Sequence, residues 1–157
     1  MRLEDEITIA VPFRDEREKV IVNVVYTYNV LLERTLRILN PFDLNDQHFN
    51  ILKTLAYHAP EPMSVGDIKR LLFNKRGDLT RLLDKLSDRG LIEREIDPDN
   101  RRVVLVTITL MGQAQLQQMD TQLMAGRDQQ NPLSEDEARH LNKLLDKLRG
   151  PHGGRED

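Results

Sequence analysis

The chain contains no cysteine and only three serines. Without cysteine there are no disulfide bonds, thiolate nucleophiles, cysteine-based redox sensors or cysteine-rich zinc sites. None of the serines lies in a Gly-x-Ser-x-Gly motif, and no glycine pattern matches a phosphate-binding loop. The acidic pair Asp97 and Asp99 is better explained by turn formation than by acid–base catalysis. We therefore expect a protein that is not an enzyme.

Histidines are also few, and none is spaced as in a metal-binding helix. The four are His48, His58, His140 and His152, without a His-x-x-x-His or His-Glu-x-x-His motif. His48 and His58 lie on one predicted helix, so either can join a metal site only with ligands from other elements. A structural or surface role is the preferred interpretation, and we expect no required metal or cofactor.

No apolar stretch approaches the roughly 20 residues that a membrane span needs, and the N-terminal sequence is acidic rather than apolar. A cytoplasmic location is expected. With 157 residues, 39% of them hydrophobic and 31% charged, the chain suits a soluble, helix-rich protein. That length accommodates one domain with a core, or a smaller domain with an oligomerisation element.

A long amphipathic pattern covers residues 14–40. Its β-branched centre, residues 20–25, is compatible with a strand, but the flanks have helical spacing and favour a helix. One broad apolar stripe contains Ile21, Val24, Val25, Tyr28, Leu31 and Leu32. Because Val22, Tyr26 and Val30 point elsewhere, the helix is predicted to make two contacts. One of these is assigned to a second copy of the chain; burial within one domain is the alternative. Residues 1–12 are expected to order only against another element.

The middle of the chain predicts three helices followed by a hairpin. Asn45, Ser64 and Asn74 are the expected N-caps, and Gly90 ends the third of these helices. That helix carries an i, i+3, i+4, i+7 core stripe of Leu79, Leu82, Leu83 and Leu86. Strands are expected at residues 91–96 and 102–109, joined by a turn at residues 98–100. Further helices are expected from about residue 109 to 125 and after the capping box Ser134-x-x-Glu137, and residues 150–157 are expected to be a disordered tail.

Basic charge is concentrated on this middle region. The formal net charge is −3, but residues 69–102 contain ten Lys or Arg and seven Asp or Glu, a local charge of +3. Phosphate contact requires such a concentration, although a mixed solvated surface explains an excess of three equally well. The leucine stripe leaves five polar residues near or on the opposite side of the helix: Lys75, Arg76, Thr80, Arg81 and Lys85. Arg101 and Arg102 follow the predicted turn, where an arginine can enter a minor groove.

A helix that can enter a DNA groove, followed by a basic hairpin, is the anatomy of a winged helix-turn-helix. Five segments, in this order, resemble the MarR family of bacterial transcriptional regulators over residues 14–148. They are Leu44–Leu52, Thr80–Leu86, Gly90–Arg94, Asp97–Arg102 and Thr109–Gly112.

This resemblance implies a mainly α fold with a small β-hairpin wing, in a single MarR-like domain covering residues 1–157. The winged helix-turn-helix would occupy residues 44–112, flanked by dimerisation helices at 14–43 and 113–148. Family members are homodimers that bind pseudo-palindromic DNA, usually as repressors, and many release it when a small, often aromatic ligand binds. The resemblance makes the helix at 74–87 the major-groove reader.

By the same resemblance, Tyr26, Tyr28 and Tyr57 border a ligand cavity, although dimer or core packing explains them equally well. Two features depart from the family pattern. Asn100 replaces the aspartate that usually precedes the first wing arginine, which puts a carboxylate–arginine pair there in doubt. The segment 74–78 is more charged than usual, so the preferred DNA sequence cannot be carried over. The alternative function is a winged-helix protein–protein adaptor without DNA binding; an effector-independent DNA-binding protein is a further alternative.

Overall fold

The computed structural model describes residues 2–8, 12–72, 78–125 and 131–151, and it divides into two compact units, residues 1–123 and 124–157. The units are described separately. The first contains helices α1 (Leu3–Glu6), α2 (Glu16–Leu39), α3 (Asp46–His58), α4 (Val65–Leu71), α5 (Leu79–Asp88) and most of α6 (Leu110–Ala125), with a 3-10 turn, η1 (Asn40–Phe42). Its strands are β1 (Met63–Ser64), β2 (Ile92–Ile96) and β3 (Val104–Ile108). The second unit contains α8 (Glu135–Arg149).

The core of the first unit gathers around the leucine stripe of α5. Leu79, Leu83 and Leu86 are buried there, and Leu82 packs against the same cluster while remaining partly exposed. The buried residues that join them from other elements include Leu39, Ile51, Leu52, Leu55, Ile68, Leu91, Ile92, Val106 and Met119. The predicted stripe is therefore confirmed, and the opposite side of α5 faces outward.

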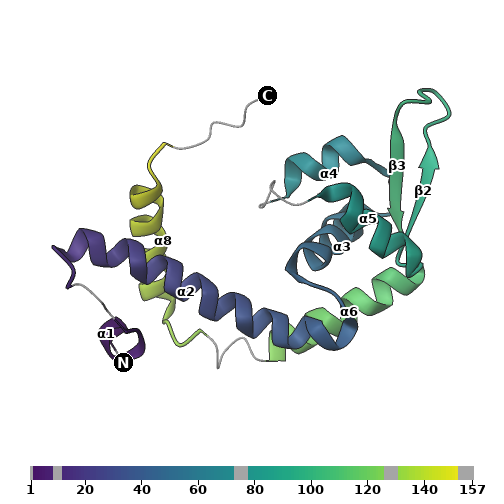
Figure 1. Ribbon diagram of the computed structural model, residues 1–157. Helices are drawn as coiled ribbons and strands as arrows, with labels where there is room; N and C mark the ends of the chain where they lie inside the picture. The colour runs from purple at the N-terminus through teal and green to yellow at the C-terminus, as the bar shows by residue number, and fades with distance from the viewer. Residues whose placement is uncertain (1, 9–11, 73–77, 126–130, 152–157) are drawn as a thin grey trace. The chain divides into compact units, whose positions relative to one another are not determined.

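The strands form an antiparallel sheet in the order β1-β3-β2. Ile92 lies opposite Ile108 and Ile96 opposite Val104, so β2 and β3 make the predicted hairpin. Figure 1 shows this hairpin projecting beyond the helices, with its turn at the free end. The two-residue strand β1 was not predicted, because two residues are too few for a visible alternation. The architecture confirms the mainly α fold with a small β wing.

Helix starts follow the predicted caps in three places and depart from them in one. Asn45, Ser64 and Ser134 each accept a hydrogen bond from the backbone N–H three residues later. The prediction that Asn74 caps the reading helix was wrong, because α5 begins at Leu79. Asp78, in an extended conformation, accepts the N–H of Arg81 there. Asparagine and aspartate are both good N-caps, and the prediction chose Asn74 without considering Asp78.

The N-terminal segment lies against α2. Leu3 is buried, the Lys19 Nζ lies 2.5 Å from a carboxylate oxygen of Glu4, and the Tyr26 hydroxyl donates to Glu6 at 3.1 Å. Tyr26, one of the residues predicted to point away from the broad apolar stripe of α2, therefore contacts a segment of the same chain. The predicted tail falls partly on residues 152–157, which lie outside the described residues.

Gly112 sits where α6 passes closest to the backbone before β2. A Cβ at this position would lie 2.1 Å from the carbonyl oxygen of Leu91 and 2.8 Å from Ile108. We expect Gly112→Ala to lower the free energy of unfolding by about 3 kcal/mol or more, because neither backbone can give way. Gly66→Ala is the matched control, since its Cβ would meet only Ser64 Oγ at 3.7 Å. Equal thermal melting temperatures for the two variants would contradict this packing.

Candidate nucleic-acid interface

The outward face of α5 begins with two exposed side chains, Thr80 and Arg81. Both lie in the first helical turn, and the Asp78 cap holds the Arg81 backbone N–H at 3.3 Å. A first turn exposed in this way presents a hydroxyl and a guanidinium, groups that can contact phosphates or read base edges. Lys75 and Arg76, predicted as neighbouring contacts, lie outside the described residues.

Lys85, the fifth predicted contact on this helix, forms an ion pair with Asp43 at 2.9 Å. Arg89 also approaches the Asp43 carboxylate, at 3.7 Å, and donates to the carbonyl oxygen of Phe42. The hydrogen bond from Lys85, followed by its charge, lowers the pKa of the Asp43 carboxyl. Asp43 has a φ of 52° and ends the turn that follows α2. Lys85 and Arg89 therefore join the C-terminal part of α5 to the turn that follows α2.

The hairpin is tied to α5 by Arg94. Its guanidinium lies 2.8 Å from the Asp84 carboxylate and donates to the Thr80 carbonyl oxygen at 3.5 Å. The Arg94 side chain is only 25% exposed, whereas Asp84 is 54% exposed. Its Nε is buried without a hydrogen-bond partner in the part of the chain that the structure describes. This contact sets the direction of the wing relative to the first turn of α5.

The turn of the hairpin is stabilised by its own backbone and two side chains. Asp97 accepts the N–H of Asp99 at 2.9 Å, and Asn100 accepts the N–H of Arg102 at 3.2 Å. Arg101 and Arg102 are exposed, and neither forms an ion pair with another described residue. Asn100 thus supports the turn by accepting a backbone N–H, and the exposed Arg101 and Arg102 are accessible to an anionic partner.

A hollow of about 420 Å³ lies beside α5, lined by Asn45, Gln47, His48, Asp78, Arg81, Leu82 and Lys85. His48 is only 5% exposed and completes a capping box, since its Nδ1 accepts the N–H of Asn45 at 3.2 Å. Burial, and then the positive charge of Lys85, lowers the pKa of His48. This explains His48 as a structural residue, as the sequence interpretation preferred.

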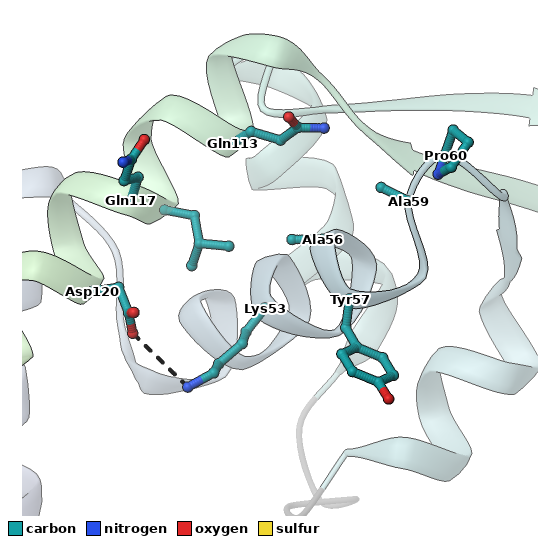
Figure 2. Close-up of a pocket in the computed structure, with 9 residues that line it drawn as sticks. Lys53, Ala56, Tyr57, Ala59, Pro60, Gln113, Gln117 and Asp120 are labelled. Carbon is teal, nitrogen blue, oxygen red and sulfur yellow. Dashed lines mark ion pairs between the residues drawn. The ribbon is translucent and has the colours of Figure 1, made fainter.

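A larger cleft, of about 740 Å³, lies between α3 and α6 (Figure 2). Ala56 and Leu116 contribute apolar surface, Gln113 and Gln117 contribute amides, and Lys53 lies 3.9 Å from Asp120. The sequence pattern did not identify this cleft, because the two helices that form it are separated by some fifty residues.

The three predicted ligand tyrosines are not brought together. Tyr57 borders the cleft, but its side chain is 86% exposed and points away from α6 in Figure 2. Tyr26 is hydrogen-bonded to Glu6, and Tyr28, on α2, is 56% exposed. Neither of these two lines the cleft.

Among the described residues, no group of three or more histidine, cysteine or acidic side chains is arranged to hold a metal ion. Over the same ranges, no helix is long and apolar enough to cross a membrane.

Comparisons with a family model, with a related sequence and with solved structures all point to the same family. The model of the MarR family matches residues 42–103. The multiple antibiotic resistance protein MarR of Escherichia coli is 30% identical over 130 residues, covering 80% of this chain and 88% of that protein. A MarR transcription factor from Planctomyces limnophilus is 32% identical, with a TM-score of 0.66, covering 85% of this chain and 98% of that one. A mutant of E. coli MarR in complex with operator DNA is 29% identical, with a TM-score of 0.70, covering 87% and 99%.

Acidification is expected to weaken the fold through His48. Its pKa in the folded protein lies below the ordinary value of about 6.5, so the unfolded chain takes up the proton first. The free energy of unfolding therefore falls as the pH drops below about 6.5 and on through the folded-state pKa. His48→Gln keeps an uncharged acceptor at the third helical position and should reduce this decline, measured by urea denaturation between about pH 7.5 and 5. His140→Gln, at an exposed position, is the control; a decline unchanged in His48→Gln would contradict the assignment.

Proposed function

The chain belongs to the MarR family, and on that premise we propose that it is a dimeric transcriptional regulator that binds a pseudo-palindromic DNA site in the cytoplasm. We further propose that it represses transcription until a small ligand releases it from the DNA. The observation that carries the proposal is the presence of two exposed cationic features on elements that an ion pair joins. Arg81 lies in the first turn of α5, Arg101 lies at the wing tip, and the Arg94–Asp84 contact joins their elements.

In the proposed complex, α5 enters the major groove with its first turn. Arg81 is suited to guanine and Thr80 to a phosphate or a base edge, whereas Arg101 and Arg102 reach the adjacent minor groove. Lys75 and Arg76 remain proposed contacts from the segment before α5. Lys85 is proposed to approach a phosphate while it keeps α5 joined to Asp43, since an ammonium group has three donors.

The proposed dimer rests on the broad apolar stripe of α2. Its exposed members are Ile21, Val24, Val25, Tyr28 and Leu31, with exposed fractions of 38–56%, and the nearby Val20 is also exposed. Within the other unit, α8 also carries exposed leucines, Leu141, Leu144 and Leu148. Apolar stripes of this size are commonly covered by a partner. A second copy would supply two reading helices, separated by about 34 Å on a palindromic site.

The cleft between α3 and α6 is the proposed ligand site. Its walls combine apolar side chains with the Gln113 and Gln117 amides, a composition suited to a small aromatic molecule. The Lys53–Asp120 pair at 3.9 Å is long and exposed, so a ligand carboxylate or phenolate can replace Asp120 as the partner of Lys53. Of the three tyrosines, Tyr57 is the one that we retain as a ligand contact. Binding there would favour a dimer whose reading helices no longer match the DNA spacing.

Substitution of the two arginines tests the DNA-binding proposal. We expect Arg81→Ala and Arg101→Ala each to weaken binding to a selected palindromic duplex by roughly 10- to 100-fold, as expected for arginine contacts to bases. Thermal stability should be unchanged because both side chains are exposed. Affinity is measured by fluorescence anisotropy at several salt concentrations. Arg139→Ala, an equal charge change at an exposed position on α8, is the matched control.

If the parent protein selects no DNA sequence and binds none at low salt, the regulator proposal fails. The adaptor alternative would then be favoured, since a protein–protein adaptor should not require Arg81 and Arg101 in this way.

A charge in the exposed stripe of α2 tests the dimer. We expect Val25→Lys to convert the dimer to monomers, because burying an unpaired ammonium at an apolar interface is costly. Sedimentation velocity measures the change, and affinity for the palindromic site should fall in parallel. Glu33→Lys places a lysine at an exposed position about 80° around the helix from Val25 and farther from the other residues of the stripe, so this variant should remain dimeric. A dimer that survives Val25→Lys would place the interface elsewhere.

A further inference from the structure

Two apolar side chains near the tip of the wing are left exposed. Ile96 ends β2 and Val104 begins β3, and they lie directly opposite each other in the hairpin. Ile96 is 64% exposed and Val104 is 38% exposed. A cross-strand pair of β-branched residues stabilises a hairpin, but it does not require this exposure on both partners. The exposed pair is therefore a candidate contact surface for another molecule.

The register of the hairpin shows on which side this pair lies. Side chains alternate along a strand, so Ile96 shares a face with Arg94, two residues earlier. Arg94 contacts Asp84 and the Thr80 carbonyl oxygen, both on α5. The pair thus continues the α5-facing side of the sheet towards the tip, where the helix no longer covers it.

The opposite side of β2 is acidic. Glu93 and Glu95 are exposed there and alternate with Arg94 and Ile96. Two carboxylates on one short strand repel phosphate groups, so DNA is disfavoured on that side. The surface that remains for DNA runs from Thr80 past the apolar pair to Arg101 at the tip.

We propose that Ile96 and Val104 pack against the deoxyribose edges of the DNA strand that lies between the α5 contact and the wing-tip contact. This inference rests on the proposed function, which it extends by two contacts that carry no charge. The C–H groups of deoxyribose are apolar, and their burial against isoleucine and valine releases water but no counterions. The pair therefore supplies a part of the affinity that does not depend on salt.

Threonine substitutions test this contact with little change of shape or strand propensity. We expect Val104→Thr to weaken binding to a selected palindromic duplex by roughly fourfold, the effect of withdrawing about one methyl group from an interface. Ile96→Thr should weaken it by more, because a hydroxyl then replaces the ethyl group of isoleucine. The double variant should lose roughly tenfold or more. In all three, the slope of log K against log salt should equal that of the parent, whereas Arg101→Ala should make it shallower by about one.

Two further variants serve as controls. Ile96→Val keeps a branched apolar side chain and should retain most of the affinity. Leu110→Thr removes an apolar side chain that is 84% exposed at the first residue of α6, beyond the end of β3 that is distant from the tip, and it should bind as the parent does. Thermal melting of each variant checks that the hairpin remains folded.

The outcomes separate this inference from the proposed function. If the parent binds DNA and Arg101→Ala weakens it, but the threonine variants bind as tightly as the parent, the apolar contact is overturned alone. A threonine variant with a shallower salt slope would overturn it too, since the loss would then come from displaced arginines. A changed sedimentation coefficient would assign the pair to a contact between copies of the chain. If the parent binds no DNA, the proposed function itself fails.

Discussion

Burial of the leucine stripe on α5 is the constraint on which the rest of the structure depends. Leu83 and Leu86 are almost completely buried, and a helix has a fixed angular step of 3.6 residues per turn. Once that stripe faces the core, Thr80, Arg81 and Asp84 must face outward. Asp84 in turn receives Arg94 and so orients the hairpin. A helix that turned its stripe elsewhere would lose both the outward cations and the support of the wing.

Several ion pairs in the first unit connect one helix or strand to another. Asp43 pairs with Lys85 and lies close to Arg89, and these contacts connect the turn after α2 to α5. The carboxylate is largely exposed, so this connection is a modest one that solvent and salt weaken. The same chain region thus links the helix proposed to hold the dimer with the helix proposed to read DNA. The contacts of Asp43 with Lys85 and Arg89 are thus the physical connection through which a shift of α2 would move α5.

Much of the fold could be predicted because its signals are local. The caps at Asn45, Ser64 and Ser134, the leucine stripe and the two wing strands all depend on residues a few positions apart. The start of α5 could not be predicted correctly, since Asn74 and Asp78 are both good caps and the choice between them depends on packing. The cleft between α3 and α6 was missed for a related reason. Its lining residues share no sequence pattern and meet only when distant helices pack together.

The sequence by itself determined the class of fold, the buried side of α5 and the position of two arginines at the hairpin turn. Hydrophobic periodicity and turn chemistry act over short distances and are visible in a string of residues. Only the tertiary structure decided which charges are engaged and which remain available. It paired Lys85 with Asp43, Arg94 with Asp84 and Tyr26 with Glu6, and it left Arg81, Arg101 and the Ile96–Val104 pair exposed. Such choices depend on which surfaces come within a few ångströms of each other, and sequence spacing carries no information on that.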